Sequence, residues 1–247
     1  MSPLYQTVAA PAIVYRASRS ANALALPAWR YILQGQRGRF DDPEDIFRVL
    51  YTATSPAGAL TEVLADLRPH YDRISEIALI TDEADDDDDD AAYEALISNA
   101  NTAMQERLAG RCMSAIEIAD QGTLFVDLGA GATRSRMELQ LDFGRLKVGD
   151  FIGRDRTLSR YASRAVFEDQ HAGLIAPSAE DSRARTVAIF ETARESNAFR
   201  VRLNVISTVP ADVDRNAVTL AIGTLLRAEE YSPLICPELV RPESEIA

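Results

Sequence analysis

Residues 38–68 constrain the fold more than any other part of the sequence. They begin with a β-prone run in which Phe47, Val49 and Tyr51 occupy alternate positions. Ser55-Pro56 follows a turn-like segment, and it is a typical helix start because serine is a favoured N-cap and proline suits the first helical position. The stretch therefore predicts a strand, a turn and a helix in close succession.

The expected helix has one apolar face and carries a glutamate away from it. Its apolar residues recur at helical spacing as Leu60, Val63, Leu64 and Leu67. At about 100° per residue, Glu62 lies roughly 200° from Leu60 and points away from that stripe. Tyr51 at the end of the strand and Glu62 on the helix could therefore form two walls of a cleft. The spacing equally allows Glu62 to face water.

The acidic composition argues against some classes of partner. The chain has 247 residues, of which 47% are hydrophobic and 26% charged, as in ordinary soluble proteins with a substantial core. Its formal net charge is −12 and its pI is near 4.7, so its long-range field repels phosphates. We therefore expect no nucleic-acid partner and no membrane surface, although a local cluster of arginines can still bind a small phosphate ligand.

The cysteine, histidine and hydropathy patterns predict a cytoplasmic protein without a metal site. Cys112 and Cys236 fit a reducing compartment better than a disulfide framework. We expect no signal peptide, and no run approaches the roughly 20 apolar residues of a membrane-spanning helix. His70 and His171 are too few and too isolated to hold a metal ion.

Six short motifs follow one another in a fixed order. They are Val14-Tyr15-Arg16, Gly38-Arg39-Phe40, Val49-Leu50-Tyr51-Thr52-Ala53, Ser55-Pro56, Ala59-Leu60-Thr61-Glu62-Val63 and Gly173-Leu174-Ile175-Ala176-Pro177-Ser178. Together they resemble the RES domain family, NAD-consuming domains named after arginine, glutamate and serine and found mainly as bacterial toxins. The similarity covers the first third of the chain and returns over residues 161–190. One departure follows the serine, where family members often carry an arginine and this chain has Ala179-Glu180.

The resemblance implies an α+β fold like that of ADP-ribosyltransferases, with a split β-sheet cleft and surrounding helices. It also implies an enzyme that cleaves the nicotinamide–ribose bond of NAD, which is then a substrate and not a cofactor. Transfer to water makes a glycohydrolase, and transfer to phosphate makes a phosphorylase. We expect a toxin of a toxin–antitoxin pair, with a cognate antitoxin protein as partner, and homo-oligomer formation stays open. The alternatives are an ADP-ribosyltransferase that modifies a protein, or a non-catalytic RES-fold module that binds a protein partner.

The same resemblance assigns roles to five residues. Arg16, Tyr51 and Glu62 are the expected catalytic residues, and substrate binding is expected from Arg16, Arg39, Tyr51 and Ser178. Because the transition state is oxocarbenium-like, Glu62 would stabilise its growing positive charge. The two arginines would hold the pyrophosphate, Tyr51 would contact the nicotinamide, and Ser178 would add a hydrogen bond. Without the resemblance, Arg16 would be a solvated strand end and Ser178 a turn serine.

The chain is expected to form one RES-like domain over residues 1–231, with an acidic and helical insertion at about 82–122 and a loose tail at 232–247. The aspartate run at 85–90 should be a solvated loop, because its charges repel one another, and a helix should follow over 91–108. The run lacks the ligand spacing, turn glycine and closing glutamate of an EF-hand, so we expect no calcium site. A strand is expected at 75–80.

Residues 124–131, LFVDLGAG, resemble the first motif of S-adenosylmethionine methyltransferases, in which a helix follows a glycine-rich turn. Met137, Leu139 and Leu141 alternate with polar residues, however, which is strand periodicity. We therefore expect two strands joined by a hairpin-like turn, and not a methyltransferase. Other strands are expected at 12–15, 174–176, 186–190 and 199–208, and helices at 155–168 and 210–227.

Overall fold

Strands from most of the chain form one mixed sheet. The computed structural model describes residues 5–29, 37–68, 87–120, 122–142, 144–152, 155–179, 184–194, 196–212 and 215–226. The strands are β1 (Thr7–Ala9), β2 (Ile13–Ser18), β3 (Val49–Ala53), β4 (Cys112–Ile118), β5 (Leu124–Asp127), β6 (Gly173–Pro177), β7 (Arg185–Phe190) and β8 (Leu203–Pro210). Their order is β1-β5-β6-β7-β3-β2-β4-β8, and neighbours are antiparallel except β5 and β6, which are parallel.

The sheet opens between two of its inner strands, β2 and β3. These strands share a single paired position, Tyr15 opposite Ala53. In contrast, β2 pairs with β4 along its full length, and β3 does the same with β7. Because the ladder between β2 and β3 is limited to one pair, the strands separate and side chains can line the space between them. The predicted α+β fold with a split sheet and surrounding helices is confirmed.

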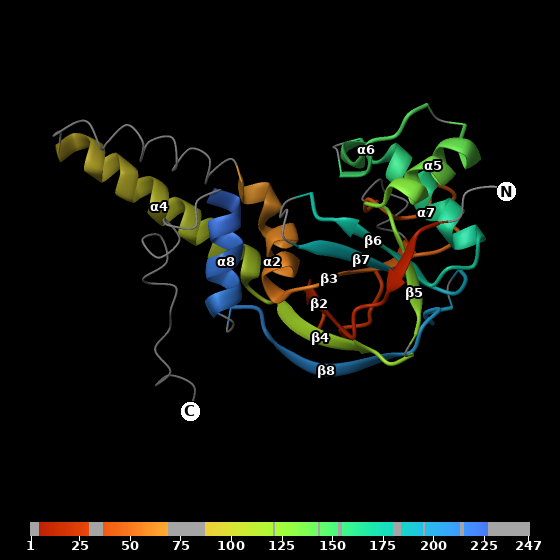
Figure 1. Ribbon diagram of the computed structural model, residues 1–247. Coiled ribbons are helices and arrows are strands. Elements are labelled where there is room, and N and C mark those ends of the chain that lie inside the picture. Colours follow the sequence, from red (N-terminus) through yellow and green to blue (C-terminus); the bar gives the residue numbers. More distant parts are fainter. Residues whose placement is uncertain are drawn as a thin grey trace.

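The helices form two separate groups (Figure 1), which pack on the same face of the sheet, because alternate residues of β3 contact one group at Tyr51 and the other at Ala53. One group contains α2 (Pro56–Leu64), α4 (Asp87–Leu108) and α8 (Arg215–Leu226), with the 3-10 turn η1 (Ala65–Leu67) after α2. The other contains α5 (Gly131–Gln140), α6 (Val148–Ile152) and α7 (Thr157–Glu168). None of the helices in the described ranges is both long and apolar enough to cross a membrane.

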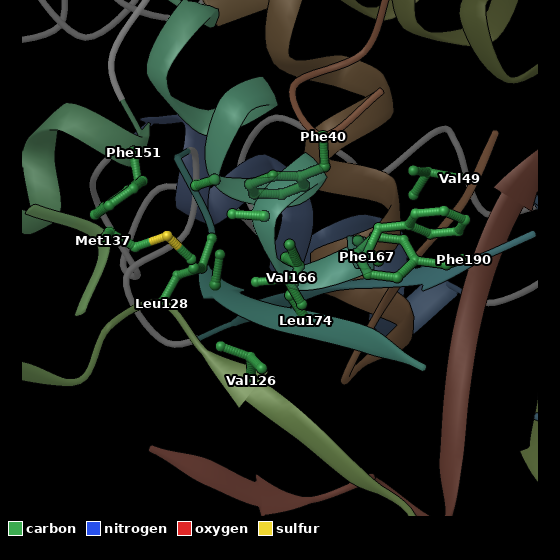
Figure 2. Close-up of a cluster of buried hydrophobic side chains, with 14 of the residues drawn as sticks. Phe40, Val49, Val126, Leu128, Met137, Phe151, Val166, Phe167, Leu174 and Phe190 are labelled. Atoms are coloured by element: carbon green, nitrogen blue, oxygen red, sulfur yellow. The ribbon is translucent and has the colours of Figure 1, made fainter. Parts of the chain in front are cut away.

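A buried aromatic cluster fixes α7 against the sheet (Figure 2). Phe47, just before β3, stacks on Phe167 of α7 with ring centroids 4.0 Å apart. Both rings also contact Phe190 of β7. Aromatic pairs of this kind add to the free energy gained by burying their large apolar surface. The position of α7 relative to β3 and β7 is therefore set by core packing.

Helix α2 begins where the sequence predicts. The Ser55 side chain accepts a hydrogen bond from Gly58 N at 3.0 Å, and Pro56 occupies the first helical position. Leu60 and Leu64 are fully buried, whereas Glu62 is exposed. The predicted direction of Glu62, away from the apolar stripe, is thus confirmed.

The solvated loop expected at 85–90 is wrong for its second part, because α4 begins at Asp87. Negative charges are favoured in the first turn of a helix by the helix dipole, so these aspartates suit a helix start. The expected insertion at 82–122 also contains β4, which lies between β2 and β8 within the sheet. The strand expected at 75–80, the first aspartates of the run and the tail at 232–247 lie outside the described residues.

The hairpin expected after β5 is wrong, because β5 leads through a turn into helix α5. Thr133 and Met137 are buried one helical turn apart, while Leu139 is 68% exposed. The alternation of apolar residues therefore did not mark one buried face. Within the turn, Gly129 N donates to Asp127 Oδ1 at 2.9 Å, so this backbone group is bonded inside the chain.

A buried ion pair joins the start of β3 to the end of β7. Arg48 lies beside Glu191, with 2.6 Å between Arg48 NH2 and Glu191 Oε1, and the Glu191 side chain is fully buried. Asn197 N also donates to Glu191 Oε1 at 2.8 Å. Because each charge is removed from water, each depends on its partner.

We predict that Glu191→Ala lowers the free energy of unfolding by about 3–5 kcal/mol, since it leaves a buried guanidinium unpaired. Urea denaturation measures the change. Glu168→Ala is the matched control, because it removes only the exposed pair between Glu168 and Arg164 within α7. That pair should contribute about 0.3–0.5 kcal/mol. Equal losses in the two variants would contradict the prediction.

Candidate active site

A cleft of about 250 Å³ lies where the sheet opens between β2 and β3. Its walls come from these two strands, from α2 and β7, from residues 38–40 and from the residue before α7. Ligand sites typically measure about 300–1,000 Å³. At about 250 Å³ the cleft lies just below this range, so it can enclose only part of a nucleotide-sized ligand, with the remainder at its mouth. Four of the five predicted site residues line it, namely Arg16, Arg39, Tyr51 and Glu62.

Glu62 projects from α2 into this cleft and is held by two hydroxyl groups. Ser178 Oγ, just after β6, donates to Glu62 Oε1 at 2.6 Å. Thr186 Oγ1, in β7, donates to the same oxygen at 3.3 Å. Glu62 Oε2 has no hydrogen bond to another described residue. The carboxylate is thus held through one oxygen, and Ser178 contacts Glu62 without itself lining the cleft.

The Tyr51 hydroxyl bonds the loop that precedes β3. It accepts a hydrogen bond from Phe40 N at 2.7 Å and donates one to Asp41 Oδ1 at 3.1 Å. Asp41 also accepts from Gly38 N. Burial, and then the nearby Asp41 charge, raise the pKa of Tyr51 well above its ordinary value. Tyr51 therefore stays protonated at neutral pH, and its ring is the part left to contact a ligand.

Arg16 and Arg39 bring positive charge into the cleft. Arg16, in β2, donates from NH1 to Ala23 O at 2.6 Å and forms no ion pair with a described carboxylate. Burial lowers the pKa of Arg16 to about 10, so the side chain is still charged at pH 7. Arg39 bonds to no other described residue. Two guanidinium groups without carboxylate partners in a partly buried cleft favour an anionic ligand.

Helix α7 supports the loop that carries Arg39. Arg160 donates to the carbonyl oxygens of Gly38 and Arg37, both at 3.1 Å. Ser163 Oγ donates to Phe40 O at 2.7 Å. These donors satisfy loop carbonyls that strand pairing does not reach. The aromatic cluster that fixes α7 therefore also fixes the loop and the backbone of Arg39.

Among the lining residues to which sequence reasoning gave no site role are Thr186 and Arg156. Arg156 lies immediately before α7, and its NH1 donates to Arg37 O at 3.1 Å. A signal for it exists, because arginines at 156, 160 and 164 recur every four residues and so share one helix face. No comparable signal marks Thr186, whose role depends on where β7 lies relative to α2.

The split sheet, the helices on it and the cleft at its opening define an α+β domain with a single candidate site among the described residues. The RES domain family model matches residues 13–214, so the chain belongs to the RES domain family, as its motifs predict. The chain also resembles a chain in the crystal structure of the M. tuberculosis MbcT–MbcA toxin–antitoxin complex, with a TM-score of 0.50 and 18% identity. The match covers 82% of this chain and 85% of that one, and it shows a shared fold. Comparison with curated proteins gave no match.

We predict that Gly38→Ala lowers the free energy of unfolding by about 1–3 kcal/mol, the usual cost of overpacking. A Cβ at this position would overlap the Tyr51 hydroxyl, which is already bonded on both sides. Gly149→Ala in α6 is the control, because a Cβ there meets no atom within 4 Å. In a helix it should stabilise by about 0.5–1 kcal/mol. Thermal or urea unfolding that moves both variants in one direction would refute the proposed overlap.

Proposed function

We propose that this chain cleaves the nicotinamide–ribose bond of NAD, with Glu62 stabilising the transition state. One observation carries the proposal: Glu62 is the sole carboxylate among the described residues that line the cleft, and three arginines line the same cleft. The two hydroxyl partners of Glu62 hold one oxygen of its carboxylate. The site thus combines a single fixed negative charge with a cationic region.

The chemistry of NAD suits this combination. The nicotinamide nitrogen is cationic, so when the bond to the ribose carbon breaks, the electron pair neutralises that nitrogen and nicotinamide leaves without a proton. The site therefore needs no general acid. The ribose develops oxocarbenium character, and a preorganised carboxylate stabilises that charge. Arg16 and Arg39 bind the pyrophosphate through one of its two phosphates, and the Tyr51 ring packs against the nicotinamide.

The acceptor completes the reaction in one of two ways. Water adds to the ribose carbon, releases a proton and gives ADP-ribose, which is glycohydrolase activity. Inorganic phosphate adds to the same carbon and gives a phosphorylated ADP-ribose, which is phosphorylase activity. Both acceptors need the same stabilised oxocarbenium ion, so Glu62 serves both reactions.

Membership of the RES domain family and similarity to a chain of a toxin–antitoxin complex support a role as the toxin of such a pair. We propose that the chain is a toxin that depletes NAD in the cytoplasm of its own cell. A cognate antitoxin protein would keep it inactive by covering the cleft. Expression of the wild type alone should then arrest growth, and inactive Glu62 variants should not.

We predict that Glu62→Gln lowers the rate of nicotinamide release from NAD by about 100-fold or more, because one electrostatic contact in a transition state contributes about 3 kcal/mol. Release is measured on purified protein with and without phosphate. Glu106→Gln, on the exposed surface of α4, is the matched control and should keep the wild-type rate.

Other outcomes would point elsewhere. Turnover that survives Glu62→Gln would remove Glu62 from the mechanism. Nicotinamide release that requires an added protein would indicate an ADP-ribosyltransferase. Failure of the wild type to release nicotinamide under every condition would overturn the proposal and favour a protein-binding module.

We predict that Ser178→Ala lowers nicotinamide release by about 10- to 100-fold, since a hydrogen bond to a charged group contributes about 1.5–3 kcal/mol. Because Ser178 acts through Glu62, adding Ser178→Ala to Glu62→Gln should cause little further loss. This double-mutant cycle separates orientation of Glu62 from a separate contact with the substrate. Fully additive losses would show that Ser178 acts independently of the carboxylate.

A further inference from the structure

Arg156 is a third positive charge in the cleft, and it belongs to none of the six motifs and to none of the strands. Arg156 immediately precedes α7 and is exposed. It lines the cleft together with Arg16 and Arg39. Its charge acts on the buried phenol of Tyr51, where it favours the ionised form. The neighbouring Asp155 carboxylate is bonded to Thr157 N, and no ion pair joins Arg156 to a described carboxylate.

The balance of charge in the cleft matches a ligand with two anionic groups. The described lining residues include three arginines and one carboxylate, Glu62, so two positive charges are in excess. A pyrophosphate carries two negative charges at neutral pH. Arginine is suited to phosphate oxygens because its planar guanidinium offers several donors in a fixed geometry. Two arginines can bind one phosphate, and a third is then available for a second phosphate.

The position of Arg156 is already fixed before a ligand arrives. Its NH1 donates to Arg37 O at 3.1 Å, which holds the guanidinium beside the loop that carries Arg39. That contact uses one of the five N–H donors of the side chain. Arg160 also bonds the Arg37 and Gly38 carbonyls, so the loop keeps support from α7 without Arg156. A role limited to holding the loop would therefore be largely redundant.

We propose that Arg156 is a specificity-determining residue that binds the second phosphate of a dinucleotide. With it, the cleft prefers substrates that contain a pyrophosphate over nicotinamide mononucleotide, which has a single phosphate. This inference rests on the proposed function, because it names the part of NAD that Arg156 contacts. Arg16 and Arg39 serve either substrate, and Arg156 serves the dinucleotide.

The test compares kcat/KM for nicotinamide release from NAD and from nicotinamide mononucleotide. Arg156→Ala should lower the value for NAD by roughly 10- to 100-fold, the size of one charged hydrogen-bond contact, and leave that for the mononucleotide within about threefold. Arg156→Lys keeps the charge but not the planar fork, so it should fall between wild type and Arg156→Ala. Arg145→Ala, an exposed arginine outside the cleft, is the control of equal charge change and should alter neither value.

Loop damage and loss of a phosphate contact give different results in this experiment. A disturbed loop would misplace Arg39 and lower both kcat/KM values by the same factor, which would overturn the proposal. An unchanged value for NAD in Arg156→Ala would overturn it as well.

A binding measurement separates this proposal from the proposed reaction. Calorimetry gives the affinities of wild type and Arg156→Ala for ADP-ribose and for ribose 5-phosphate. Selective loss of ADP-ribose affinity would support the role of Arg156 even if the wild type released no nicotinamide, a result that overturns the reaction alone. Equal affinities in both proteins, or no binding of ADP-ribose by the wild type, would refute the role of Arg156.

Discussion

The single pair of residues shared by β2 and β3 is the constraint on which the site depends. If the ladder between these strands continued, backbone hydrogen bonds would close the space that the cleft occupies. Each strand is fully paired on its other side, with β4 and with β7, so the sheet remains continuous around the opening. Arg16 and Tyr51 can then face one space from opposite walls.

The loop at 37–42 carries Arg39, and the packing of the core determines where this loop lies. The stack of Phe47 on Phe167 places α7, and Arg160 then bonds the loop carbonyls. From the other side, the Tyr51 hydroxyl bonds Phe40 N and Asp41. A neutral phenol is the form that this arrangement needs, because an ionised one beside Asp41 would place two negative charges in a buried space. Burial and the Asp41 charge raise the pKa of Tyr51 and so favour this neutral form.

Local sequence signals predicted the helices and strands of the site better than the contacts between them. Ser55-Pro56 marks the start of α2 by capping alone, and helical spacing alone sets the direction of Glu62. The bonds from Ser178 and Thr186 to Glu62 depend on the register of β6 and β7 relative to α2, which no local pattern contains. The alternation around Leu139 is that of a strand, but this leucine is exposed within α5, so the alternation did not mark a buried face.

The positive cleft and the acidic chain are compatible because their effects act over different distances. At physiological ionic strength the Debye length is about 8 Å, so charges on distant surfaces are largely screened at the cleft. Arg16 is partly buried, where screening is weaker and attraction to a phosphate is stronger. Its pKa of about 10 shows the cost of that burial and still leaves the guanidinium charged. A formal net charge of −12 can therefore repel a large polyanion while the cleft attracts a dianion small enough to enter it.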